Sequence, residues 1–261
     1  MILPVAWLRS SSALSIVVTG PQKGRVVIGV DNRFTNASED LPGEWSVSGE
    51  GSHVVVIDHH DSFTYNLVQA LARPGVQVSV RLSDQLTLEQ LQDLQPDRLL
   101  LSPGPGAPAE ATLAHQALEY FHRRIPVLGV CLGHQVIAEH FGARVEPTGV
   151  PAHGKPESVY HDCCGIFSAL PVPFSAARYH SLAVVRDSLP DVLRVTAWSG
   201  SDMVMGLGVP GEATWGVQFH PESFLTEHGD LILEAFISGV RCREMASKSV
   251  PGQERTQSGA R

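Results

Sequence analysis

The residues with the most evident chemical potential surround Cys131. The apolar run Val127–Val130 leads into Gly-Val-Cys-Leu-Gly at 129–133, and a helical pattern begins directly after it. This is the form of a nucleophile elbow, a tight, strained strand-to-helix turn that needs small flanking residues and would point Cys131 into the open. The helix N-terminus behind the turn favours a thiolate over a thiol. A buried structural cysteine fits the same five residues equally well, so residues elsewhere must decide.

A base and its orienting carboxylate are encoded at His220-Pro221-Glu222. Side chains two residues apart in an extended backbone point to the same face, so Glu222 can lie beside His220 while the proline stiffens the link. The carboxylate would fix the imidazole tautomer and leave the other ring nitrogen to take a thiol proton, as in a Cys-His-acid triad. Alone, His-Pro-Glu is a turn tripeptide, but an upstream elbow cysteine favours the catalytic interpretation.

A third candidate element is the Pro/Gly loop at 102–108, which contains Gly104, Pro105 and Gly106. Its prolines fix φ and its glycines permit close backbone approach, so the loop can hold N–H groups rigidly towards the elbow. Together with the N–H of Leu132, a glycine N–H from this loop would meet the negative charge that develops on an attacked carbonyl. The alternative for the loop by itself is a turn-rich connection between a strand and a helix.

The elements that must position these residues alternate between strands and helices from residue 53 onwards. Unbroken apolar runs predict strands at 54–58, 77–82, 98–102 and 127–130. Helices are expected at 63–72, capped by Asp61 or Ser62, at 87–94, capped by Thr87, at 110–123, and after Cys131. This alternation predicts an α/β doubly wound fold with a mostly parallel sheet covered by helices on both faces. Ligands of such sheets bind outside the carboxyl ends of the strands, where Asp58, the 102–108 loop and Cys131 all fall.

Beyond residue 142 the pattern changes to short β-like segments that would extend the sheet or build a second one. They are expected at 158–160, 182–185, 192–197, 203–209 and 214–219, followed by a final helix at 230–238. Residues 1–52 form an extension of unknown structure, either a hairpin with β-like runs at 15–19 and 25–30 or a disordered segment. The main domain then spans 53–240, and 241–261 is a polar tail.

Composition excludes several classes of function. The chain has 261 residues, 43% of them hydrophobic, with 19 basic against 27 acidic residues and no block of Lys and Arg, so nucleic-acid binding is not expected. No apolar run is long enough to span a membrane. Four cysteines without Cys-x-x-Cys spacing indicate a reducing compartment, and we expect a cytoplasmic protein. Zinc at 161–164 would need a second ligand cluster that the sequence does not offer, so no metal and no cofactor are predicted.

Six motifs, taken in order, resemble those of the class I (triad) glutamine amidotransferases. Within that family the chain is most similar to the glutaminase subunits, component II, of anthranilate synthase and aminodeoxychorismate synthase. The resemblance covers about residues 53–240 and leaves out the first 52. The motifs are Asp58 with Asp61-Ser62-Phe63-Thr64-Tyr65-Asn66, Ser102-Pro103-Gly104-Pro105-Gly106, Gly129-Val130-Cys131-Leu132-Gly133-His134-Gln135, His153-Gly154-Lys155, Tyr179-His180-Ser181-Leu182 and Gly216-Val217-Gln218-Phe219-His220-Pro221-Glu222-Ser223.

The resemblance implies a role for each site residue. Cys131 would attack the side-chain carboxamide of glutamine, His220 would move protons, and Glu222 would orient His220. The N–H groups of Leu132 and of the 104–106 loop would hold the oxyanion. Gln135 and the backbone at Ser181-Leu182 would hold the amino-acid end of the substrate. A glutamyl thioester would form, ammonia would leave, and water would release glutamate.

Ammonia is useful only when an acceptor site receives it, and the chain shows no phosphate-binding loop and no second domain for an acceptor. We therefore expect a partner polypeptide, which the resemblance implies is a chorismate-binding synthase subunit making anthranilate for tryptophan or aminodeoxychorismate for folate. Three alternatives are a different ammonia acceptor, a cysteine peptidase or deglycase on a similar scaffold, and a regulatory partner whose site is blocked by its N-terminal extension.

Overall fold

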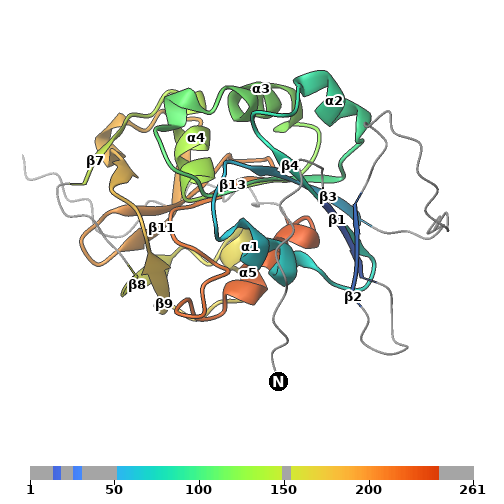
Figure 1. Cartoon of the computed structure of the whole chain (residues 1–261). Coiled ribbons are helices and arrows are strands. Elements are labelled where there is room, and N and C mark those ends of the chain that lie inside the picture. The colour runs from blue at the N-terminus through green and yellow to red at the C-terminus, as the bar shows by residue number, and fades with distance from the viewer. Residues whose placement is uncertain (1–13, 19–25, 31–51, 149–153, 241–261) are drawn as a thin grey trace, which may run out of the picture.

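A computed structural model describes the backbone at 14–18, 26–30, 52–148 and 154–240, with side chains from residue 52 onwards. Within these residues one 11-stranded sheet has the order β2-β1-β4-β3-β5-β6-β13-β12-β11-β8-β9 (Figure 1). None of the described helices is long and apolar enough to cross a membrane.

The centre of the sheet is parallel. Four consecutive pairings, β4 with β3, β3 with β5, β5 with β6 and β6 with β13, all run in the same direction. Consecutive apolar residues dominate the central strands β3, β5 and β6, as expected where helices cover both faces of a sheet, whereas β4 alternates apolar and polar residues. The predicted α/β fold with a parallel central sheet is therefore confirmed. The strands are β3 (Ser52–Asp58), β4 (Val76–Leu82), β5 (Arg98–Leu101), β6 (Val127–Val130) and β13 (Thr214–Val217).

Two hydrophobic cores lie on opposite faces of this sheet. In Figure 1 the helices α1 (Thr64–Leu71) and α5 (Gly229–Ile237) cover one face, and α2 (Leu88–Asp93), α3 (Thr112–Phe121) and α4 (Leu132–His140) cover the other. Alternate residues of β3 belong to the two cores, because successive side chains of a strand point to opposite faces. The elbow residue between β6 and α4 is thereby held between two packed layers.

The first two helices begin differently. Thr87 caps α2 as predicted, since its hydroxyl accepts from Gln90 N at 3.3 Å and its own N–H donates to Gln90 Oε1 at 2.9 Å. The predicted cap of α1 is wrong: the helix begins after Phe63 without a side-chain cap. Asp61 Oδ1 accepts from Phe63 N at 2.6 Å, and Phe63 precedes the first residue of α1. The side chain of Asp61 therefore does not cap the helix, because the chain ahead of α1 is held by hydrogen bonds to Asp58 at the end of β3.

The β-like segments of the C-terminal half both extend the main sheet and form a second, smaller one. Four antiparallel strands extend the sheet beyond β13: β12 (Val204–Gly208), β11 (Arg194–Ser199), β8 (Lys155–His161) and β9 (Phe174–Arg178). A separate antiparallel pair joins β7 (Val145–Pro147) to β10 (Leu182–Val184). The strands β7 and β9 were not predicted. The expected helix at 110–123 is a 3₁₀ turn, η1 (Pro108–Glu110), followed by α3.

The β-like runs expected in the N-terminal extension correspond to β1 (Leu14–Val18) and β2 (Val26–Val30). They pair as an antiparallel hairpin, and β1 adds antiparallel to β4 at the edge of the sheet. The other residues of 1–51, the segment 149–153 and the predicted tail at 241–261 lie outside the described residues. The proposed domain boundaries stay a prediction.

Candidate active site

The elbow at Cys131 has the strained geometry that its sequence predicts. Cys131 lies between β6 and α4 with φ 53° and ψ −98°, a region that side chains other than glycine rarely occupy. Strain of this kind costs about 1–3 kcal/mol and persists only where the surrounding structure enforces it. Here Cys131 N donates to Val217 O at 2.9 Å, and Cys131 O accepts from Gln135 N at 3.2 Å. The turn is thus anchored to β13 on one side and to the helix on the other.

The flanking glycines allow the turn to pack. A Cβ atom on Gly129 would lie 2.3 Å from the carbonyl oxygen of Gly133, and one on Gly133 would lie 2.4 Å from the carbonyl oxygen of Leu101. Both clashes are with backbone, which cannot rotate away. The expectation that Cys131 points into the open is wrong, because its residue surface is only 8% exposed and it packs within a core cluster.

His220 and Glu222 form the expected pair. Nδ1 of His220 lies 2.6 Å from Glu222 Oε1, and the Glu222 side chain has no exposed surface. Burial by itself would lower the pKa of His220, but hydrogen bonding to Cys131 and Glu222 and the negative charges of both groups outweigh it and raise the pKa to about 10. At neutral pH the ring is therefore an imidazolium between a carboxylate and a sulfur. The structure brings Cys131, His220 and Glu222 together.

Two aromatic rings that sequence reasoning did not assign to the site pack against the imidazole. Ring centroids lie 6.0 Å apart for Phe63 and His220, 5.1 Å for Tyr179 and His220, and 5.7 Å for Phe63 and Tyr179. Both residues belong to the six motifs, but no spacing rule places either next to a histidine far along the chain. They limit the positions that the His220 ring can adopt.

The predicted oxyanion loop meets the elbow through one of its residues. A Cβ atom on Gly104 would lie 2.9 Å from the Leu132 side chain and 2.5 Å from Cβ of His59, so Gly104 packs directly beside Leu132, the residue that follows Cys131. Pro105 and Gly106 are exposed, and Gly106 faces the Glu110 carboxylate with φ +88°. Of the predicted loop residues, Gly104 is therefore the one best placed for the oxyanion role, which stays a prediction.

The residues expected to hold the substrate's amino-acid end lie on one side of the elbow. Gln135 Nε2 donates to Leu182 O at 3.0 Å and to Gln218 Oε1 at 3.2 Å, which uses both of its amide hydrogens and leaves its carbonyl oxygen as the group that can accept from a ligand. Ser181 is exposed, and its carbonyl oxygen accepts from Thr148 N at 2.9 Å. Gln135 and Leu182 are thus brought together, with Ser181 next to them at the surface.

Comparison with known proteins decides the family. The family model described as Glutamine amidotransferase class-I matches residues 55–240. The chain belongs to that family. The chain is similar to anthranilate synthase component 2 of Thermus thermophilus, with 49% identity over 70% of this chain and 91% of that one. It is also similar to aminodeoxychorismate synthase component 2 of Serratia marcescens, with 43% identity over 71% of this chain and 99% of that one.

A solved structure agrees with this family. The crystal structure of a putative GMP synthase protein from Thermoplasma acidophilum superposes with a TM-score of 0.65 at 26% identity, covering 73% of this chain and 94% of that one. The resemblance that the six motifs predicted is confirmed at the level of family and fold. His153, from the fourth motif, lies outside the described residues.

Two other histidines of this amidotransferase domain neighbour the site without titrating near pH 7. Burial and the charge of Arg178 lower the pKa of His180 to about 4, and burial lowers the pKa of the fully buried His134 to about 3. The His180 ring accepts from Arg178 Nε at its Nε2, 3.0 Å away, and Nδ1 lies 2.7 Å from Leu182 O. Both histidines are therefore neutral at pH 7.

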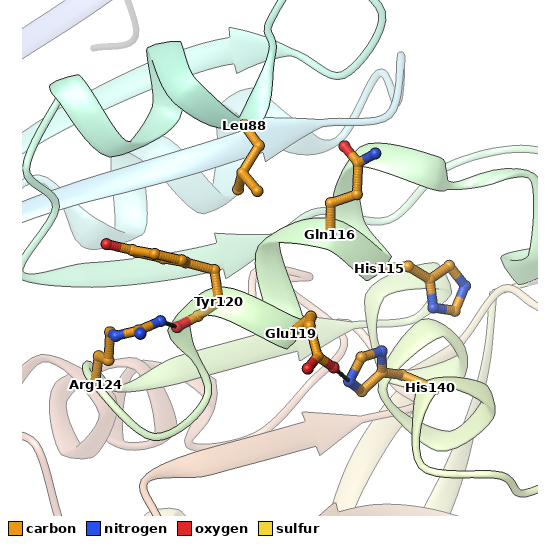
Figure 2. A pocket seen from close by; sticks show the side chains of 7 residues that line it. All are labelled: Leu88, His115, Gln116, Glu119, Tyr120, Arg124 and His140. Carbon is orange, nitrogen blue, oxygen red and sulfur yellow. Dashed lines mark hydrogen bonds and ion pairs between the residues drawn. The ribbon is translucent and has the colours of Figure 1, made fainter.

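A groove lies at the opposite end of α4 from Cys131. Figure 2 shows this groove of about 510 Å³ between α2, α3 and α4, where Glu119 contacts His140 at 3.6 Å and Arg124 stacks 3.9 Å above the Tyr120 ring. It contains none of the predicted site residues and no paired nucleophile and base. In the described part of the chain no group of three or more His, Cys, Asp or Glu could hold a metal ion. The residues that line the groove are Leu88, His115, Gln116, Glu119, Tyr120, Arg124 and His140.

Proposed function

We propose that this chain is the glutaminase subunit of a chorismate-using synthase and that Cys131, His220 and Glu222 are its catalytic triad. The observation that carries the proposal is the strained, glycine-flanked Cys131 beside a buried His220–Glu222 pair. The class I amidotransferase family and the component 2 relatives support the same chemistry.

The first half of the reaction uses the thiolate and the imidazolium. The Cys131 sulfur attacks the side-chain carbonyl carbon of glutamine, forming a C–S bond while the carbonyl oxygen takes negative charge. The N–H groups of Leu132 and the Gly104 loop are proposed to meet that charge. His220 then gives its proton to the leaving nitrogen, the C–N bond breaks, and ammonia departs from a glutamyl thioester.

The second half reverses the proton movement. Neutral His220 takes a proton from water, the resulting hydroxide attacks the thioester carbon, and the C–S bond breaks to release glutamate and restore the thiolate. Glu222 holds the ring through Nδ1 in both halves, so that Nε2 faces the reacting atoms.

The ammonia passes to a partner synthase that binds chorismate. Relatives of both pathway types are similar to this chain, at 49% and 43% identity. The proposal therefore includes anthranilate for tryptophan synthesis, aminodeoxychorismate for folate synthesis, or both. A cytoplasmic location, expected from the cysteine pattern, belongs to the same proposal.

The test is Cys131→Ala, measured in complex with each candidate synthase partner. Glutamine-dependent product formation should fall to background, while product formation from added ammonium is retained. Cys163→Ser, at an exposed cysteine, is the matched control and should retain both activities. Loss of both activities in Cys131→Ala would indicate a structural cysteine. If the wild-type complexes make neither anthranilate nor aminodeoxychorismate from glutamine, the proposed pathway is refuted.

A further inference from the structure

Gln218 reaches the nucleophile from the end of β13. Its side-chain Nε2 lies 3.8 Å from Cys131 Sγ, in the range of hydrogen bonds to sulfur, and the residue is fully buried. We propose that Gln218 is a further catalytic residue of this site, one that donates an N–H to the Cys131 sulfur and stabilises it as a thiolate. This inference rests on the glutaminase function proposed above.

The polarity of the Gln218 amide is dictated by its neighbours. An amide could present either nitrogen or oxygen to the sulfur, and only the nitrogen can donate. The carbonyl oxygen of Leu182 can only accept, so it requires the nitrogen of Gln135 at 3.0 Å. That nitrogen in turn requires the oxygen of Gln218 at 3.2 Å, which leaves the Gln218 nitrogen for Cys131. The chain Leu182–Gln135–Gln218 therefore presents a donor, never an acceptor, to the sulfur.

The carbonyl that begins this chain is itself held in place. His180 Nδ1 lies 2.7 Å from Leu182 O. Because Arg178 can only donate, its 3.0 Å contact with His180 Nε2 puts the His180 proton on Nδ1, where it bonds the carbonyl. Arg178 also pairs with the Glu157 carboxylate. The orientation of an amide beside the nucleophile is thus fixed by a chain of polar contacts that ends at an ion pair.

A donor at this position acts on the charged form of the sulfur. A thiol is a weak acceptor, whereas a hydrogen bond to an ionised group is about twice as strong as one between neutral groups. Since the Gln218 side chain is buried, water does not replace the donor when it is lost. The backbone of Gln218 has its own bond, from N to Met205 O at 3.0 Å, so a side-chain change leaves the pairing with β12 intact.

The first test is Gln218→Met, which keeps side-chain length and removes the donor. We would measure the rate of Cys131 alkylation by iodoacetamide against pH, following the Cys131 peptide by mass spectrometry so that Cys163, Cys164 and Cys242 do not contribute. The midpoint of the profile should rise by about one pH unit or more, and the kcat for glutamine should fall roughly 10- to 100-fold. An unchanged profile with an unchanged kcat would overturn the inference.

Two more variants separate catalysis from packing. Gln218→Glu keeps the shape of the side chain but places an oxygen acceptor beside the sulfur, so the midpoint of the alkylation profile should rise at least as far as in Gln218→Met. This variant provides the test if Gln218→Met does not fold. A purely structural role predicts lower thermal stability in both variants with the wild-type alkylation profile, which would refute the proposal. Gln116→Met, an exposed change in the groove of Figure 2, is the control and should alter neither profile nor kcat.

The same measurements separate this inference from the function on which it rests. If the wild-type complex has no glutaminase activity and its Cys131 reacts no faster at neutral pH than the exposed Cys163, the proposed function itself fails. If the wild type is active and both Gln218 variants retain its profile and kcat, only the role of Gln218 fails.

Discussion

At the residue scale, Cys131 and the charge on Glu222 together favour the protonated form of His220. The carboxylate lies 2.6 Å from Nδ1, has no exposed side-chain surface, and is one of the groups that raise the pKa of the ring to about 10. A carboxylate in this position stabilises the imidazolium more than it stabilises the neutral ring. The protonation state of His220, the proposed base, therefore depends on Cys131 and on its neighbour two residues along the chain, Glu222.

Glu222→Gln should lower the pKa of His220, because it removes a negative charge and keeps the shape. Imidazolium then loses its proton at a lower pH, so the alkaline limb of the kcat/KM profile for glutamine should move to lower pH. The kcat should fall roughly 10- to 100-fold, the usual worth of a hydrogen bond to a charged group. Stopped-time glutamate assays across pH would measure both effects. A wild-type alkaline limb in the variant would contradict this role of Glu222, and activity with added ammonium is the control for an intact complex.

Sequence reasoning reached the three proposed catalytic residues but missed some of the side chains that surround them. Cys131 and the His220–Glu222 pair were recognisable because elbow glycines and an i, i+2 spacing are local patterns. Phe63, Tyr179 and Gln218 approach the site through contacts between residues far apart in the chain, and no local pattern encodes those contacts. The burial of Cys131 was missed for the same reason, since it depends on side chains from β13 and the loop after it.

At the scale of elements, the β6–elbow–α4 unit depends on how closely α4 approaches β5. Gly133 sits where a Cβ atom would be 2.4 Å from the carbonyl oxygen of Leu101, inside the contact distance of any real side chain. The approach of helix to sheet sets the position of the N–H groups behind Cys131.

Gly133→Ala should force α4 away from β5 and destabilise the fold by about 1–3 kcal/mol, the usual cost of overpacking a core. Urea unfolding followed by circular dichroism would measure the free energy of unfolding. Gly200→Ala is the matched control, since nothing lies within 4 Å of a Cβ atom there and its φ is not positive. Equal stability of the two variants would show that the helix can shift at little cost.

Element type followed from the sequence more reliably than element boundaries. Parallel strands such as β3 and β6 were predictable because each is dominated by consecutive apolar residues, and α2 because Thr87 and Gln90 form a local capping box. The start of α1 was misplaced, since Asp61 serves the turn held by Asp58 and not the helix itself. The three-residue strand β7 exists because β10 pairs with it, which residues 145–147 do not reveal by themselves.

At the scale of the whole molecule, buried histidines connect the fold to pH. His134 and His180 have folded-state pKa values of about 3 and about 4, well below the ordinary value of 6.5. The unfolded chain therefore binds protons at these two positions more readily, and stability must fall as pH drops below 6.5. His220 has the opposite sign, because its pKa is raised to about 10: its contribution is fully present below pH 6.5 and is lost as pH rises through 10.

Acid should therefore weaken the fold through His134 and His180. Between pH 7 and pH 5, each should remove about 2 kcal/mol from the free energy of unfolding, since each pH unit below 6.5 and above the folded pKa is worth about 1.36 kcal/mol. His180→Asn should make the dependence on pH shallower by about half, measured by urea unfolding at both pH values. His228→Asn, at an exposed residue with φ +58° that asparagine tolerates, should keep the wild-type dependence. If His180→Asn loses as much stability as the wild type over this range, His180 is already charged in the folded protein. In that case both ring nitrogens carry a proton, and the contact with Arg178 could not be used to place a single proton on Nδ1.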